Sequence, residues 1–242
     1  MESRAPVGNR RRTGGSQTRM IPLRSSERTY STASALLVII LLNVLVFFYE
    51  ISLPRYALNS LIMHYGIVPD RFHYSSLLTS MFLHGGFLHI AGNMWFLWVF
   101  GRNIEDLLGH ERFVMFYLLC GLVAGFAHLL ANPGSPIPTV GASGAIAGVM
   151  GAYLIKFPRA HIVTLVPILI FITTLDIPAA FLLLYWFAIQ FFSGVGSVGD
   201  YSQMSHGDVA WFAHVGGFLA GMGLILVMPP VRRRIKSWNR DV

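Results

Sequence analysis

Hydrophobic residues in this 242-residue chain fall into long blocks that contain few charges. Six blocks are mainly apolar over 14 to 21 residues each. A helix needs about 20 mainly apolar residues to cross a bilayer, and fewer where neighbouring protein shelters its ends. The pattern therefore predicts an all-α, polytopic membrane protein with six membrane-spanning helices. The predicted spans are Ala33–Leu53, Phe87–Phe100, Phe113–Ala131, Ala142–Phe157, Ile177–Phe192 and Val209–Met228.

One apolar stretch, residues 162–192, is longer than a single span needs. It contains Asp176 and two prolines, Pro167 and Pro178, which disfavour an uninterrupted helix. We therefore expect an interfacial or re-entrant segment, followed by one helix, in preference to two complete spans.

Composition supports a membrane protein. Hydrophobic residues make up 54% of the chain and charged residues 12%, whereas a soluble domain carries about 25% charge. Seven of the 18 Lys and Arg residues lie in the first 28 positions, and five more follow residue 231. The net charge of +7 thus belongs to the two ends of the chain and not to a folded basic face. This distribution argues against a soluble enzyme, a disordered chain and a nucleic-acid partner.

The basic residues also predict an orientation, because short cytoplasmic segments collect Lys and Arg. Six crossings put both basic ends on one side, together with Arg102, Arg112, Lys156 and Arg159. We therefore expect a basic cytoplasmic tail at 1–32, a six-span domain at 33–228 and a second basic cytoplasmic tail at 229–242. The tails are expected to contact anionic lipid at the inner (plasma) membrane of the cell. An Arg-rich and Ser-rich start is also compatible with an organellar transit peptide.

Three polar residues fall at one depth in the predicted second, fourth and sixth spans. Thirteen residues separate His89 from Arg102, and thirteen separate Ser143 from Lys156. His214 lies 15 residues before Pro229. At about 1.5 Å per residue, each lies roughly 20 Å above the inner face. Ionisable and polar groups are costly inside a membrane, so their shared depth indicates a site.

The residue types at this depth suit acyl transfer. A serine hydroxyl needs a base to become a nucleophile, and histidine is the usual base. Ser143 and His214 could form that pair if their spans pack closely, which the small residues Gly144, Gly148, Gly151, Gly217 and Gly221 favour. Asn93 lies one helical turn from His89, and both could donate hydrogen bonds to an oxyanion, with the backbone N–H of Ser143.

Residues 35 to 228 resemble the rhomboid family of intramembrane serine proteases, of the minimal six-span bacterial type. The family motif G-x-S-G matches Gly141 to Gly144, which implies Ser143 as nucleophile. A-H-x-G-G matches Ala213 to Gly217, which implies His214 as general base. H-x-x-x-N matches His89 and Asn93, which implies oxyanion donors. A G-x-x-x-E-x-x-x-G pattern around Glu105, from Gly101 to Gly109, implies a structural role.

The sequence departs from the family pattern at two places. A Trp-Arg pair often found in the first outer loop reads Ser75-Ser76 here, which bears on the placement of the loop. Some members carry an aromatic residue four positions after the serine, stacked on the catalytic histidine. Here that residue is Ala147, so another group is expected to position His214.

The resemblance implies an endopeptidase that cuts membrane-anchored proteins near the outer part of a transmembrane segment, with no cofactor or metal. The fifth span and the 193–208 loop are candidates for a mobile gate and cap. The alternative is a non-catalytic rhomboid-like protein that binds and escorts membrane clients; such relatives usually lack the serine or the histidine. Cys120 is the only cysteine, so an intramolecular disulfide is impossible. No H-E-x-x-H string of a zinc protease occurs, and a small transporter is disfavoured because no repeat with paired broken helices is evident.

Overall fold

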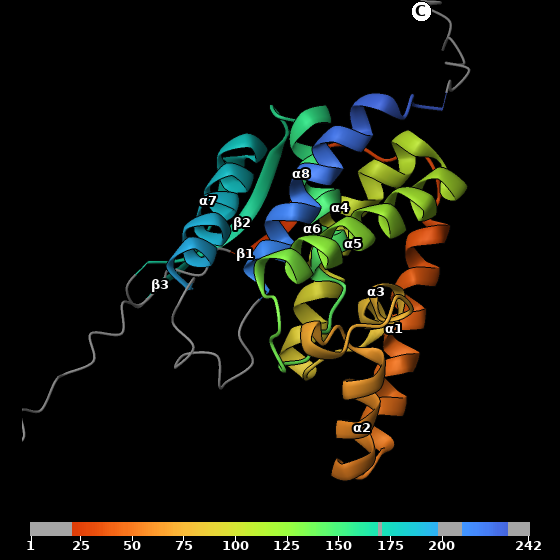
Figure 1. The fold of residues 1–242 in the computed structure, drawn as a ribbon. Helices are drawn as coiled ribbons and strands as arrows, with labels where there is room; N and C mark the ends of the chain where they lie inside the picture. Colours follow the sequence, from red (N-terminus) through yellow and green to blue (C-terminus); the bar gives the residue numbers. More distant parts are fainter. Residues whose placement is uncertain (1–20, 169–170, 198–209, 232–242) are drawn as a thin grey trace, which may run out of the picture.

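Helices form most of the molecule, and six of them coincide with the six predicted spans (Figure 1). The computed structural model describes residues 21–168, 171–197 and 210–231. By length and apolar composition, α1 and α5 are each sufficient to cross a membrane, whereas α6, α8 and the Ala179–Val195 part of α7 are shorter apolar helices. The six helices are α1 (Ser34–Ser52), α4 (Phe87–Leu108), α5 (His110–Ala131), α6 (Ser143–Lys156), α7 (Ala179–Ser197) and α8 (Trp211–Val227).

The prediction of an all-α fold is wrong in one region. Within the stretch expected to hold an interfacial or re-entrant segment before one helix, the chain forms the antiparallel hairpin β2 (His161–Ile168) and β3 (Phe171–Pro178). The first strand, β1 (Ile21–Ser25), pairs antiparallel with β2, so the sheet order is β1-β2-β3. The hairpin is rich in Ile, Val and Thr, whose branched side chains favour a pleated strand.

Part of the expected N-terminal tail is folded against the helices. The carbonyl of Pro22 accepts a hydrogen bond of 2.5 Å from the indole nitrogen of Trp95. The hydroxyls of Ser25 and Tyr153 are also 2.5 Å apart. Residues 21–25, which were predicted to belong to the tail at 1–32, therefore pack against the helical domain. The tail residues 1–20 and 232–242 lie outside the described residues.

The segment between α1 and α4 is built from short helices. It contains α2 (Arg55–Tyr65), η1 (Pro69–Arg71), α3 (Ser76–Thr79) and η2 (Ser80–Phe82). At the family's Trp-Arg position, the buried Ser76 donates its hydroxyl to the His73 carbonyl at 2.6 Å. Ile67 pairs with Thr139 as an isolated β-bridge. The segment is thus fixed by local bonds and by the loop that leads to α6.

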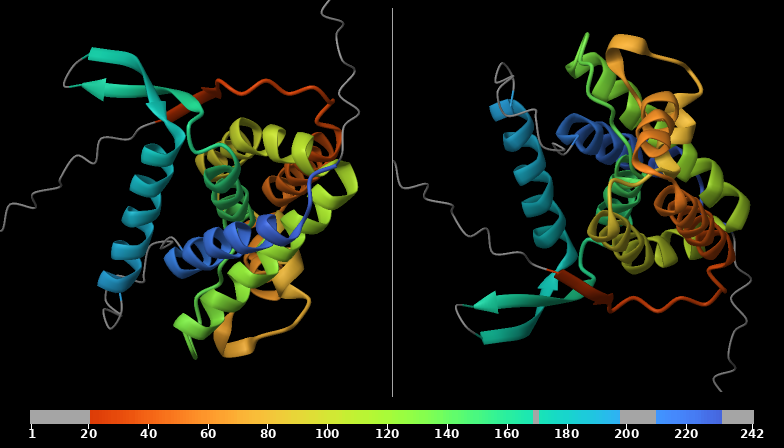
Figure 2. Two further views of the ribbon diagram at one scale, coloured as in Figure 1. Left: turned by 90° about the horizontal axis from the view of Figure 1, so that it is seen from above. Right: turned by 90° about the horizontal axis from the view of Figure 1, so that it is seen from below.

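Helix α6 lies at the centre of the bundle, with α4, α5 and α8 around it, while α7 stands to one side near the sheet (Figure 2). The predicted close packing of small residues is confirmed. A Cβ atom at Gly217 would meet the carbonyl of Gly144, and one at Gly221 would meet the backbone of Gly148. Any larger residue at these positions would push α6 and α8 apart.

Glu105 ties the ends of three helices together. Its carboxylate accepts hydrogen bonds from the backbone N–H groups of Ala35 and Leu36, both at 2.9 Å, in the first turn of α1. It also lies 2.5 Å from Nδ1 of His110, the first residue of α5. A carboxylate is favoured there because the first N–H groups of a helix have no partner within the helix. The structural role expected for this motif agrees with these contacts.

Candidate active site

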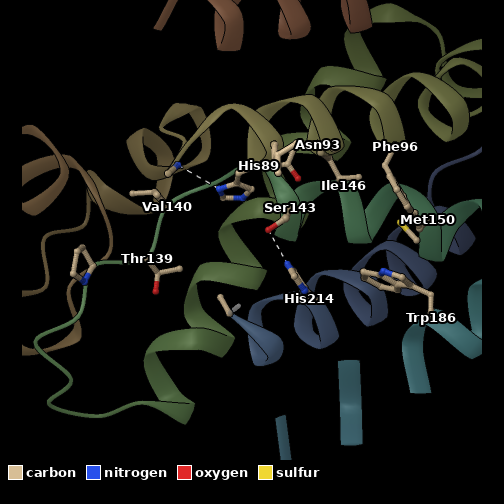
Figure 3. Close-up of a pocket in the computed structure, with 15 residues that line it drawn as sticks. His89, Asn93, Phe96, Thr139, Val140, Ser143, Ile146, Met150, Trp186 and His214 are labelled. Carbon is tan, nitrogen blue, oxygen red and sulfur yellow. Dashed lines mark hydrogen bonds between the residues drawn. The ribbon is translucent and has the colours of Figure 1, made fainter. Parts of the chain in front are cut away.

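The structure brings Ser143 and His214 into direct contact. Ser143 is the first residue of α6, and His214 lies in the first turn of α8. The Ser143 Oγ atom is 2.7 Å from Nε2 of His214 (Figure 3). Gly144 follows Ser143 directly and Gly217 lies three residues after His214, so the tight contact between these glycines fixes the separation of the pair. This is the geometry in which a histidine can take a proton from a serine hydroxyl.

The other nitrogen of His214 bonds to a residue that the sequence analysis did not identify. Its Nδ1 atom is 2.6 Å from Oε1 of Gln190, and both side chains are buried. The ring of Trp186, one turn earlier in α7, has its centroid 5.7 Å from that of His214. Two side chains of α7 therefore contact His214, whereas the sequence has only Ala147 four positions after the serine.

His89 and Asn93 project from α4 toward Ser143 from the side opposite His214 (Figure 3). The Nδ2 atom of Asn93 is buried and has no hydrogen-bond partner among the described residues. Gly141 has φ of +131° and lies directly beneath this pair: a Cβ atom there would be 2.9 Å from Nε2 of His89 and 3.7 Å from Nδ2 of Asn93. A side chain at 141 would therefore fill the space next to both donors.

A hydrogen bond from the loop before α4 determines which ring nitrogen of His89 carries the proton. Nδ1 of His89 accepts a hydrogen bond of 3.3 Å from the N–H of Gly85. The proton of a neutral ring is then on Nε2, the nitrogen nearest Gly141, and this nitrogen can donate. Ser143 begins a helix, so its own N–H lacks an acceptor within the helix and adds a third donor.

Glu50 and His84 support that loop. The buried Glu50 carboxylate of α1 accepts a hydrogen bond from the backbone N–H of His84, at 3.1 Å and 3.2 Å to its two oxygens. The His84 ring packs edge-on against His89, with centroids 5.2 Å apart. Burial lowers the pKa of His84 to about 4, and the neighbouring His89 adds to the shift, so His84 is neutral at pH 7. A neutral ring can sit beside His89 without electrostatic repulsion.

A cavity of 530 Å³ opens onto these groups. Its walls come from α4, the loop before α6, α6 itself, α7 and α8, and include Ser143, His89, Asn93, Trp186 and His214 (Figure 3). Helix α6 has 14 residues, or about 21 Å of rise, less than the roughly 30 Å hydrocarbon core. Ser143, the first residue of α6, lines the cavity.

All four residues predicted from the sequence line this cavity. The sequence did not predict Gln190, which bonds to His214, or Glu50, which bonds to the loop before α4. Both missed residues lie in mainly apolar helices, and a polar residue in a membrane helix is a functional candidate. Their positions in the sequence do not show which residue either of them bonds to. Most of the loop proposed as a cap, 198–208, lies outside the described residues.

Comparison with known proteins gives the family. Residues 71–230 match the Rhomboid domain. The chain is 42% identical over 78 residues to the Rhomboid protease GluP of Bacillus subtilis (strain 168), covering 32% of this chain and 15% of that protein. It is 37% identical over 90 residues to the human Presenilin-associated rhomboid-like protein, mitochondrial, covering 36% and 24%. It is 32% identical over 159 residues to RHOMBOID-like protein 6, mitochondrial, of Arabidopsis thaliana, covering 64% and 44%.

The protein belongs to the rhomboid family. The match covers the helices α4 to α8 and therefore every residue of the predicted site. Membership establishes a polytopic membrane protein that is mostly helical. The chain spans less than half the length of each of these three relatives.

Proposed function

We propose that this protein is an intramembrane serine endopeptidase that cleaves the transmembrane segments of membrane-anchored proteins. The observation that carries the proposal is the 2.7 Å contact between Ser143 Oγ and His214 Nε2 at the edge of a cavity inside a membrane protein. Similarity to proteins named rhomboid proteases supports it.

The chemistry follows from the groups around the cavity. Ser143 attacks the scissile carbonyl while Nε2 of His214 takes the hydroxyl proton, and the resulting oxyanion is held by His89, Asn93 and the Ser143 N–H. The imidazolium then protonates the departing amine as the C–N bond breaks, which leaves an acyl-enzyme. Water attacks this ester with His214 again as base, and the released serine regains its proton. No cofactor or metal takes part in these steps.

Topology and location are part of the same proposal. Six crossings, with both termini cytoplasmic, put Ser143 on the outer side of the inner (plasma) membrane, as in the minimal bacterial type of the family. The first support is charge: sixteen of the 18 Lys and Arg residues then lie on the inner side. The second is the short α6, which begins at Ser143. Substrates are expected to be cut near the outer end of their transmembrane segment, and the basic tails to contact anionic lipid.

The test is cleavage of a model transmembrane substrate by the purified full chain in liposomes, with Ser143→Ala and His214→Ala as variants. Each variant should lose at least about 10⁴-fold in rate, because removal of either member of such a pair abolishes nucleophilic catalysis. Cleavage that persists in Ser143→Ala contradicts the proposal. Substrate binding without cleavage by the wild type across a broad panel would instead identify a non-catalytic protein that escorts membrane clients.

A further inference from the structure

Gln190 is the only amide side chain in the apolar helix α7, and it is 7% exposed. A buried amide in such a helix is costly unless it forms a hydrogen bond. Its Oε1 atom satisfies this requirement at Nδ1 of His214, 2.6 Å away. We propose that Gln190 is a positioning residue that sets the tautomer and orientation of His214, an inference that rests on the proposed function.

The positions of the protons support this role. An amide oxygen can only accept, so the proton of the neutral His214 ring is on Nδ1. Nε2 then presents its lone pair to Ser143 Oγ at 2.7 Å, and the hydroxyl donates to it. The reversed amide would donate to Nδ1 and move the ring proton to Nε2, where it would block transfer from Ser143. With its oxygen toward Nδ1, Gln190 holds His214 in the form that can act as a base.

The interaction differs from that of a carboxylate because Gln190 is neutral. A carboxylate in this place also stabilises the imidazolium formed during the reaction, and loss of its negative charge and tautomer control costs about 10⁴-fold. A neutral amide can orient the ring and fix its tautomer without compensating the charge. We therefore expect its removal to slow the reaction of Ser143 by about 10- to 100-fold, less than loss of a charged partner.

The same helix forms a wall of the cavity. Trp186 lies one turn before Gln190, so both face His214, and Trp186 also lines the cavity. Other α7 side chains are exposed on the far side, among them Phe181, Leu184 and Phe192. One helix, α7, therefore both lines the cavity and supplies the hydrogen bond to His214.

Two substitutions at one position separate shape from hydrogen bonding. Gln190→Met keeps a side chain of similar length but lacks an acceptor, whereas Gln190→Glu keeps an acceptor for Nδ1–H. Leu184→Ala is the matched control on the same helix, because the Leu184 side chain is 52% exposed. Thermal unfolding of all four proteins in detergent records any general loss of stability.

The first measurement is independent of activity. ¹⁵N NMR of histidine-labelled full-length protein reports which ring nitrogen of His214 carries the proton, with the signal assigned from His214→Asn. We expect an Nδ1-protonated ring in the wild type, in Leu184→Ala and in Gln190→Glu. Gln190→Met should shift the ring toward the Nε2-protonated form.

The second measurement is the rate of labelling of Ser143 by a fluorophosphonate probe, which reacts with an activated serine without needing a transmembrane substrate. Gln190→Met should label about 10- to 100-fold more slowly than the wild type, and Gln190→Glu within about fivefold of it. If Gln190→Met does not fold, Gln190→Asn, whose amide is one methylene too short to reach, must show the same two changes.

The outcomes separate this inference from the proposed function. Wild-type tautomer and labelling rate in both Gln190→Met and Gln190→Asn would overturn the positioning role while leaving the protease assignment intact. A wild type that neither labels nor cleaves, with a His214 tautomer that still follows residue 190, would overturn the protease assignment and support the role of Gln190.

Discussion

Two helices hold His214, and they do so by different physical means. Helix α8, which carries the residue, is pressed against α6 through glycines, so that backbone meets backbone at Gly217 and Gly221. Helix α7 contacts the ring through one buried hydrogen bond and the edge of an aromatic cluster that includes Trp186, Phe187 and Phe218. The first contact fixes the distance between Ser143 and His214, and the second fixes the direction in which the ring points.

The α6–α8 contact is rigid, whereas the contact of α7 with His214 can adjust. Backbone contacts between glycines leave no side chain to repack, so the α6–α8 contact has one arrangement. Contacts of α7 are made by side chains, and much of its surface faces away from the protein. The Gln190 contact of α7 can therefore change without any change in the separation of α6 and α8.

The largest effect is expected from a substitution that separates α6 from α8. A side chain in Gly221→Val would meet the backbone of Gly148 and force α6 and α8 apart. We expect a loss of about 3 kcal/mol or more in the free energy of unfolding, and no labelling of Ser143. Thermal unfolding and fluorophosphonate labelling measure the two effects. Gly223→Val is the matched control, since a Cβ at Gly223 meets no atom within 4 Å; an equal effect there would show that the α6–α8 contact is not special.

A second test concerns the close approach of Gly141 to His89, one of the proposed oxyanion donors. Gly141→Ala would put a Cβ atom 2.9 Å from the His89 ring, in a backbone conformation with φ of +131°. Displacing a preorganised donor should lower kcat by about 100-fold, with a small change in KM.

The control for this test is Gly134→Ala. Gly134 also has positive φ, +72°, but a Cβ atom there meets no atom within 4 Å. Only the backbone cost of about 1 kcal/mol in stability is expected at that position. Equal loss of kcat in the two variants would mean that strain, and not the space beneath His89, limits position 141.

The smallest effect is expected from weakening α7 without touching its hydrogen bond. The ring of Phe187 lies with its centroid 4.8 Å from that of Phe218. Phe187→Ala should lower the free energy of unfolding by about 1 to 2 kcal/mol, because part of an aromatic contact is lost. Labelling of Ser143 should change less than about threefold while Gln190 remains. A labelling loss as large as that of Gln190→Met would show that packing of α7, and not its hydrogen bond, orients His214.

The sequence predicted the six long helices well because length and apolar composition decide them locally. Phe87–Phe100 was extended to Leu108 in the structure, since α4 continues through Arg102 and Glu105, whose charges made the segment look like a span end. The region 161–178 was not predicted, because an isolated hairpin has too little support of its own. It is stabilised by β1, a partner about 140 residues earlier in the chain.

The sequence by itself predicted the candidate site residues Ser143, His214, His89 and Asn93, together with the small residues that let their helices meet. The sequence predicts these features because polar and small residues are easily identified in an apolar chain. The position of a residue along a helix axis also follows from its number. Only the tertiary structure decided which polar residues form hydrogen bonds with one another. Gln190 and Glu50 lie in apolar spans with no local motif, and rotation of each helix about its axis determines what a side chain meets. That rotation is set by packing among all the helices, so the pairing of Gln190 with His214 and of Glu50 with His84 appears only in the folded bundle.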